Sequence, residues 1–309
     1  MKFVKDLYDH EKRKWNLLKT YDSFSLDDVI DGKVVKNEFG CFYLMEKTVD
    51  IPRKEEKKED DLYSELRLIK GIGEKRKKAL EARGIKNISD LLQKEIYAED
   101  AQNFLDEIHD KRYLDIYRRI GRNLPRSHPI HISFLDQIGL ENILFFDIEC
   151  SGFKKGSIFL IGTASFIDDK LKIDQFFARS EDEEKSILKE FESEMRKKLV
   201  LVSFNGKRFD ENVIKNRRDH HDMEMRFSIP HVDLLPLAKK RWRNICGSHG
   251  LSNLESQVLN IQRQNDIPSV LIPHFYRLFL EKDNPGPLIP IIEHNRIDLI
   301  SIAKLLLQM

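Results

Sequence analysis

Two acidic residues, Asp147 and Glu149, lie one residue apart where an apolar run ends, in the segment FFDIECSG. In a strand, alternate residues point to the same side, so the two carboxylates are expected to lie side by side. Such a pair is destabilised by burial and by mutual repulsion unless it shares a proton or a cation. A metal ion would neutralise the pair, although strand capping or pairing with Lys or Arg would also accommodate it.

Two further segments add candidate ligands. In LVSFNGKRFDENVI, residues 201–214, an apolar strand is expected to end at SFNG, and Asp210 to open a helix. Asp210 alone could be a first-turn acid that the helix dipole favours. In EHNRIDLISIAKLL, His294 and Asp298 are four residues apart and therefore lie on one face of a helix. An ordinary hydrogen-bonded pair on a surface helix would have the same spacing.

The three segments in this order, D-x-E, N-x-x-x-F-D and H-x-x-x-D, resemble the DEDDh group of DnaQ-like 3′→5′ exonucleases, which have the ribonuclease H-like fold. The sequence is most similar to the YprB-like, ribonuclease H-like family of predicted exonucleases. The resemblance runs from about Ile143 to the C-terminus and includes NGKRFD, HVDLLPLAKKRW, GLSNLESQVLNIQRQNDIP and HNRIDLISIA. Cys150 departs from the pattern, because many DnaQ-like members carry threonine there, and it is expected to be a small buried residue and not a nucleophile.

The resemblance implies a two-metal-ion phosphodiester hydrolysis with Mg²⁺ or Mn²⁺, hard cations that prefer oxygen ligands. In that assignment Asp147 bridges both ions. Glu149 and Asp298 complete the ion on the nucleophile side, and Asp210 holds the ion on the leaving-group side. His294 is the general base, since imidazole titrates near neutral pH.

Residues near these motifs carry weaker expectations. Asn205 and Lys207 lie in the turn before Asp210, where an amide and a cation could contact the substrate backbone, or could equally be a plain turn and a surface lysine. Asp233 in HVDLL is expected to be a helix N-cap and not a metal ligand. Glu255 and Arg263 match the family pattern, but the sequence alone assigns them no chemistry.

A second motif lies upstream, in LRLIKGIGEKRKKALEARGIKNISDLL, residues 66–92. Two helical segments are expected to flank Gly71-Ile72-Gly73, which resembles a helix-hairpin-helix DNA-binding motif. Glycines allow close approach to a phosphate, and the amides that begin the next helix point at it. The cations around this hairpin are Lys70, Lys75, Arg76, Lys77 and Lys78. They are expected to bind DNA phosphates without reading sequence, whereas the alternative is a helix C-cap beside a solvated face.

The elements that position these residues form an α/β pattern. From Asn142 onward apolar runs alternate with helical segments, so residues 142–309 are expected to form a ribonuclease H-like domain with a mixed central sheet flanked by helices. Residues 62–126 are expected to form a small helical domain. Residues 53–61, RKEEKKEDD, are expected to be a charged linker, and residues 1–52 a small segment that contains two strands around Asn37 to Gly40.

Composition limits the other possibilities. No apolar run approaches the roughly 18 residues that span a bilayer, and the N-terminus lacks the apolar core of a signal peptide, so a cytoplasmic location is expected. Cys41, Cys150 and Cys246 are far apart, which favours reduced thiols. The net charge of +1 requires any surface that binds nucleic acid to be local.

Two classes of function remain open. The first is a 3′→5′ exonuclease on single-stranded or frayed DNA, with RNA as the alternative substrate, since the fold serves both. The second is a non-catalytic nucleic-acid-binding module. Because all four acids and the histidine are present, the enzyme is favoured over the binding module. DNA is expected as the partner in preference to RNA.

Overall fold

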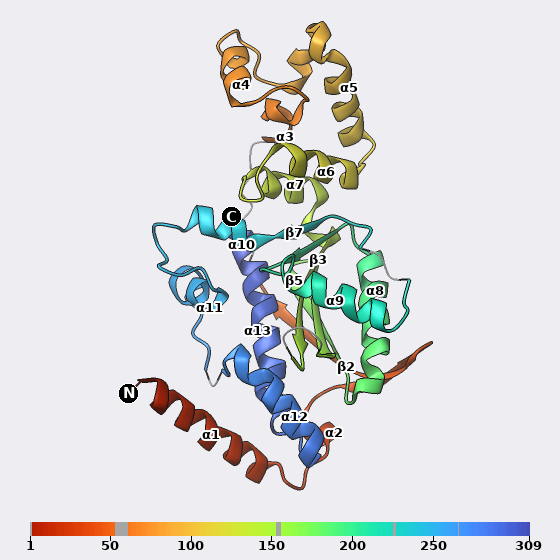
Figure 1. The fold of residues 1–309 in the computed structure, drawn as a ribbon, viewed down its shortest axis with the longest axis vertical. Coiled ribbons are helices and arrows are strands. Elements are labelled where there is room, and N and C mark those ends of the chain that lie inside the picture. Colours follow the sequence, from red (N-terminus) through yellow and green to blue (C-terminus); the bar gives the residue numbers. More distant parts are fainter. Residues whose placement is uncertain (1, 53–60, 153–155, 225–226, 265) are drawn as a thin grey trace.

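The structure is a computed structural model that describes residues 2–52, 61–152, 156–224, 227–264 and 266–309. The predicted charged linker, residues 53–61, lies outside the described residues except for Asp61. In the described part of the chain, residues far apart in sequence join one mixed sheet that is flanked by helices (Figure 1). The predicted fold class is therefore confirmed.

The described residues form a seven-stranded sheet with the order β1-β2-β5-β4-β3-β6-β7. The strands are β1 (Lys33–Asn37), β2 (Gly40–Asp50), β3 (Ile143–Cys150), β4 (Ile158–Ile167), β5 (Lys170–Phe177), β6 (Val200–Ser203) and β7 (His231–Asp233). From β1 to β3 in this order, neighbouring strands pair antiparallel. Strand β6 runs parallel to β3, and β7 runs parallel to β6. The two expected N-terminal strands are present, and β2 pairs with β5 from Tyr43–Phe177 to Asp50–Lys170. Residues 33–50 therefore continue the sheet of the downstream domain.

Helices cover both faces of this sheet, and the alternation of β3 decides which side chain meets which helix. Phe145 packs on Phe166, in the apolar cluster that contains Leu299 of α13 (Leu288–Leu307). Its neighbour Phe146 points to the other face and packs on Phe191 of α8 (Glu184–Arg196). Figure 1 shows α13 and α8 on opposite sides of the sheet. By the same alternation, Asp147 and Glu149 share the face of Phe145, beneath α13.

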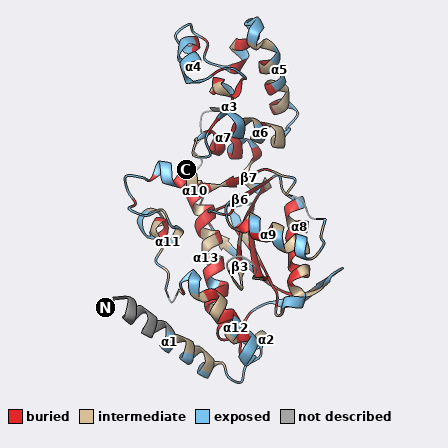
Figure 2. Cartoon of the chain, in the orientation of Figure 1, coloured by how far each residue is buried: buried red, intermediate tan, exposed pale blue. Residues whose placement is uncertain are grey.

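The described elements between β2 and β3 are all helices and 3₁₀ turns. They are α3 (Asp61–Ser64), a 3₁₀ turn (Leu66–Leu68), α4 (Glu74–Glu81), a 3₁₀ turn (Ile88–Gln93), α5 (Glu95–His109), α6 (Tyr113–Asn123), α7 (Ile130–Ile138) and a 3₁₀ turn (Leu140–Asn142). Leu66, Leu68 and Phe104 are fully buried in this region, and their apolar cluster is continuous with the one beneath α13. Figure 2 shows α4 largely exposed, and Leu80 is its buried residue.

The other described helices surround the sheet or lie at its ends. They are α1 (Lys2–Thr20), α2 (Leu26–Val29), a 3₁₀ turn (Glu181–Glu183), α9 (Asp210–His220), α10 (Leu234–Arg241), α11 (Leu251–Leu254), a π-helical turn (Glu255–Leu259), a 3₁₀ turn (Ser269–Leu271) and α12 (Ile272–Lys282). None of the helices in the described ranges has the length and apolar content that crossing a membrane requires.

Candidate active site

The structure places the four predicted acids near one another, close enough for their charges to interact. Asp147 and Glu149 lie on β3, Asp210 in the first turn of α9, and Asp298 on α13. Burial raises the pKa of all four carboxyls, and the negative charge of Asp298 raises the pKa of the other three further. For Asp210, burial and then the charges of Asp233 and Asp298 raise the pKa to about 8. Four acids that oppose one another's ionisation create a strong demand for positive charge.

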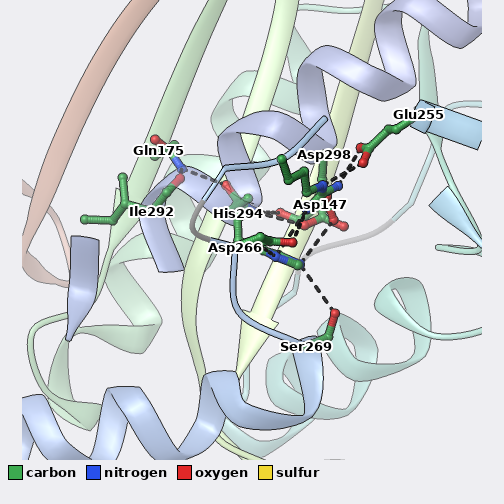
Figure 3. Close-up of polar contacts among 10 residues, drawn as sticks. Asp147, Gln175, Glu255, Asp266, Ser269, Ile292, His294 and Asp298 are labelled. Carbon is green, nitrogen blue, oxygen red and sulfur yellow. Dashed lines mark hydrogen bonds and ion pairs between the residues drawn. The ribbon is translucent and has the colours of Figure 1, made fainter. Parts of the chain in front are cut away.

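Asp147 is held in place by Asn295, which the sequence analysis did not predict. The Asn295 amide donates to Asp147 Oδ2 at 2.9 Å, and its oxygen accepts from Gln175 Nε2 at 2.9 Å. Gln175 also donates to the carbonyl of Ile292 at 2.9 Å (Figure 3). Gly162 pairs with Asp147 across the sheet, and a Cβ there would lie 2.1 Å from Asn295 Oδ1. Because Gly162 has no side chain, Asn295 has the space it needs to reach Asp147.

His294, the predicted general base, is also buried and oriented. Its Nδ1 lies 2.7 Å from Asp266 Oδ1, and its Nε2 lies 3.7 Å from Asp298 Oδ2. Ser269 Oγ lies 3.4 Å from the same Nε2 (Figure 3). Burial lowers the pKa of His294, but the hydrogen bond to Asp266 and the charge of Asp298 outweigh it, so that the net pKa is raised. Asp266 was not predicted, although it lies inside the segment IQRQNDIP that carries the resemblance.

Glu255 and Arg263, which had no predicted role, form the other side of the site. Arg263 donates to both oxygens of Glu255, from Nε at 2.6 Å and from Nη2 at 2.5 Å. The same Nη2 donates to Asp298 Oδ1, and Nη1 lies 3.2 Å from His294 Nδ1. The side chains of Glu255 and Arg263 are 1% and 8% exposed, so this ion pair is shielded from water. In Figure 3, Glu255 faces Asp298 across the drawn network.

The turn that leads to Asp210 is shaped by Asn205, Gly206 and Asp233. Asn205 has a left-handed φ of 65°, and its backbone N–H donates to Asp233 Oδ1 at 2.7 Å. Asp233 Oδ1 also accepts from the Leu235 amide at 3.0 Å, which confirms the predicted N-cap of α10. A Cβ on Gly206 would lie 2.7 Å from Asp210 Oδ2, so only glycine lets the turn approach this acid so closely.

Lys207 in the same turn points away from the acids. Its Nζ donates to the hydroxyl of Tyr117 on α6 at 2.6 Å and lies 4.8 Å from the centre of that ring. Burial and the positive charge of Arg126 lower the pKa of Lys207. Contact between Lys207 and nucleic acid would therefore require its ammonium to leave Tyr117. Asn205, by contrast, is exposed and accessible without such a change.

Two open cavities reach the acids. One, of about 440 Å³, is lined by Asp147, Phe204, Asn205, Leu235, Lys239, Ser248, His249, Gly250, Leu251 and Asp298. The other, of about 110 Å³, is lined mainly by apolar side chains beside Glu149 and Cys150. The Cys150 thiol donates to the carbonyl of Gly152 at 3.2 Å, and burial raises its pKa to about 11, which agrees with the expected absence of a nucleophilic role.

The donor chemistry of this site fits a hard divalent cation, because its candidate ligands, Asp147, Glu149, Asp210 and Asp298, offer carboxylate oxygens. Within the described ranges, no three His, Cys, Asp or Glu side chains already converge closely enough to hold a metal ion. Asp298 is bonded to Arg263 and Asp147 to Asn295, which occupies one oxygen of each acid. The acids would have to move together to bind an ion jointly.

The upstream hairpin has the backbone that its glycines predict. Gly71 has a φ of +85°, and Gly73 is the N-cap residue of α4. Lys70, Lys75, Arg76 and Lys78 are exposed on this segment. Lys77 is instead half-buried and donates to Glu65 at 3.0 Å. The segment before the hairpin is a 3₁₀ turn and not a full helix. The helix-hairpin-helix assignment stays a prediction.

Comparisons with known proteins agree with this fold. A model of the RNase H superfamily matches residues 144–309, more than half of the chain. The chain is 31% identical over 175 residues to the uncharacterized protein YprB of Bacillus subtilis (strain 168), and the match covers 54% of this chain and 42% of that protein. The chain thus spans less than half the length of this relative.

Among solved structures, the family B DNA polymerase of Pyrobaculum calidifontis is similar over 53% of this chain and 24% of its own, with a TM-score of 0.44 and 15% identity. The zinc-bound complex of E. coli ExoI with single-stranded DNA is similar over 52% of this chain and 44% of its own, with a TM-score of 0.32 and 14% identity.

Proposed function

Because the chain belongs to the RNase H superfamily, we propose that it is a metal-dependent nuclease that hydrolyses phosphodiester bonds of nucleic acid. One observation supports this most directly: four carboxylates from β3, α9 and α13, two of them buried and two half-buried, lie in one neighbourhood and have raised pKa values. Buried acids are costly unless a cation compensates them, and such clusters are typical of functional sites.

The ligands in this proposal are the carboxylates of Asp147, Glu149, Asp210 and Asp298. Two bound divalent cations, Mg²⁺ or Mn²⁺, would activate water and neutralise charge at the scissile phosphate. The chain's own contribution is orientation. Asn295 fixes the Asp147 carboxylate, and the bond between Nδ1 of His294 and Asp266 fixes the imidazole. With Nδ1 engaged, Nε2 of His294 is the atom that accepts the proton of the attacking water.

The proposed substrate is a single strand or frayed end of DNA, digested from its 3′ end, with RNA as the alternative. The groove that Asp147 and Asp298 line also carries Asn205, Lys239 and His249, polar groups suited to a phosphate backbone. The exposed cations of the upstream hairpin would hold the strand at a second place. The 3′→5′ polarity and the DEDDh assignment are what the resemblance to DnaQ-like exonucleases implies.

The test compares wild type with Asp147→Asn, which keeps the size of the side chain and removes its charge. Both proteins are incubated with 3′-labelled and 5′-labelled single-stranded DNA and RNA of equal sequence, in Mg²⁺, Mn²⁺ or EDTA. We expect stepwise shortening of the 5′-labelled strand and early release of the 3′ label, dependent on metal and absent in the variant. Intact strands with both metals, in a wild-type protein that binds them, would leave the non-catalytic binding module as the function.

A further inference from the structure

The guanidinium of Arg263 is surrounded by acidic groups of the proposed site. Its Nε and Nη2 donate to the two oxygens of Glu255, and Nη2 also donates to Asp298. Its Nη1 lies 3.4 Å from Asp266 Oδ2 and 3.2 Å from His294 Nδ1. Arg263 therefore contacts a proposed metal ligand, the proposed base and the acid that orients this base.

Arg263 is also the main source of positive charge at these acids. Among the described residues, the ion pairs of Asp298 involve Arg263 and His294, and the ion pair of Glu255 involves Arg263. No ion pair of Asp147, Glu149 or Asp210 occurs within the described ranges. A guanidinium is always charged, so in the absence of a metal ion it is the permanent cation of this site.

Glu255 determines how firmly Arg263 can hold Asp298. It lies in the π-helical turn Glu255–Leu259, is 1% exposed, and takes Nε and Nη2 in a two-point contact. Paired contacts of this kind are the strong form of an arginine–carboxylate bond, and π-helical turns often occur at functional sites. Asp298, by comparison, accepts one hydrogen bond, from the Nη2 group that also donates to Glu255. Asp298 can therefore lose its bond to Arg263 while Arg263 remains paired and buried.

We propose that Arg263 is a positioning residue that competes with the divalent metal for Asp298, and that Glu255 limits this competition by holding the guanidinium back. Without metal, the contact places a positive charge beside Asp298 and holds its carboxylate in place. When a cation is bound to Asp298, Arg263 remains on Glu255 and repels the cation at short range. Arg263 therefore lowers the affinity of the site for metal, and Glu255 raises it. The inference rests on the proposed metal-dependent function.

The test measures Mn²⁺ binding to the full chain by calorimetry, after removal of metal with EDTA, together with melting temperatures with and without Mn²⁺. Arg263→Met removes the charge and should bind Mn²⁺ about tenfold more tightly, which corresponds to about 1.4 kcal/mol. It should also melt at a lower temperature than wild type without metal and recover much of this loss with Mn²⁺. Glu255→Gln should bind Mn²⁺ more weakly, because Arg263 is then free to engage Asp298 fully. Arg263→Lys keeps the charge but loses the two-point contact with Glu255, so it should bind Mn²⁺ no more tightly than wild type.

The control is Arg243→Met, an exposed arginine after α10, which should leave Mn²⁺ affinity unchanged. Unchanged or weaker Mn²⁺ binding by Arg263→Met, or equal effects of Arg263→Met and Glu255→Gln, would overturn the proposal. If Arg263→Met does not fold, the other two variants still test the proposal: Glu255→Gln must bind Mn²⁺ more weakly than wild type, and tighter binding by Arg263→Lys would contradict it. Mn²⁺ binding by wild type that is lost in Asp147→Asn supports the metal site even where the competition fails. Wild type that binds no Mn²⁺ refutes both.

Discussion

The ammonium of Lys207 lies 2.6 Å from the hydroxyl oxygen of Tyr117, which ties the turn before Asp210 to helix α6. The Tyr117 hydroxyl in turn donates to the carbonyl of His231, at the start of β7. One phenol group thus connects the helical region with two segments of the sheet domain. The contact gives the helical region a fixed position beside the candidate active site.

Tyr117→Phe should lower the free energy of unfolding by about 1 to 2 kcal/mol, because half-buried Lys207 and the His231 carbonyl both lose a partner. Urea unfolding at neutral pH measures this change. Tyr113→Phe on the same helix is the matched control, since the Tyr113 ring packs on Phe134 without a described hydroxyl partner, and it should cost less than about 0.5 kcal/mol. Equal effects of the two variants on the free energy of unfolding would show that the hydroxyl contacts of Tyr117 do not stabilise the protein.

Gly162→Ala should damage both stability and activity. The new Cβ would lie 2.1 Å from Asn295 Oδ1 and 2.7 Å from Leu299 Cδ1, in a fully buried layer. Overpacking of this kind costs about 1 to 3 kcal/mol, and displacement of Asn295 frees Asp147. Metal-dependent cleavage by Gly162→Ala and by Asn295→Ala should fall to a similar extent, and the double variant should be little worse than either one.

The control for this prediction is Gly121→Ala on α6, where a Cβ would meet nothing within 4 Å. A glycine in a helix is unfavourable relative to alanine, so this change should stabilise the protein by up to about 1 kcal/mol. Full cleavage activity of Gly162→Ala would refute the role assigned to the contact between Asn295 and Asp147.

Removal of exposed cations around the hairpin should weaken nucleic-acid binding without changing the chemistry. The double variant Lys75→Ala and Lys78→Ala should reduce affinity for DNA and lower the slope of log K against log salt by about 2. Fluorescence anisotropy with labelled DNA at several salt concentrations measures both. Removal of Lys36 and Lys47, two exposed cations on β1 and β2, is the matched control. If both pairs change the slope alike, the hairpin has no special part in binding.

The positions of the catalytic candidates could be predicted because the sequence patterns that carry them are local. The strand period placed Asp147 and Glu149 on one face, and the helical spacing placed His294 beside Asp298, 3.7 Å between Nε2 and Oδ2. The N-cap role of Asp233 follows from its own neighbours and is confirmed. Such features depend on the backbone that a few adjacent residues adopt.

The supporting residues could not be predicted in the same way. Asn295 bonds to Asp147 across 148 residues, and Arg263 reaches Asp298 across 35, so no local period reveals either contact. Asn295 does have one signal, since it lies three residues before Asp298 and therefore shares its helix face. The joining of β2 to β5 is equally non-local, which is why two short strands could be predicted but not the sheet that they extend.

Stability should depend on pH in the acid range through Glu65, which is 5% exposed. Burial alone would raise its pKa, but hydrogen bonds from Arg67 and Lys77 outweigh burial and lower the pKa to about 2 from its ordinary value of 4.5. The unfolded chain therefore binds this proton at higher pH than the folded chain does. The stabilisation is complete above the unfolded pKa and is lost as pH falls from about 4.5 towards 2.

Glu65→Gln should therefore lower the free energy of unfolding at neutral pH by about 3 kcal/mol, since the pKa falls from 4.5 to about 2 and each pKa unit corresponds to about 1.4 kcal/mol. It should also flatten the decline of stability between pH 4.5 and 2 relative to wild type. Urea unfolding at a series of pH values gives both quantities. Glu74→Gln is the control, because Glu74 is exposed and contacts Arg67 from outside, where an ion pair contributes little. A wild-type profile that declines no more steeply than that of Glu65→Gln would mean that Glu65 is not held ionised by Arg67 and Lys77.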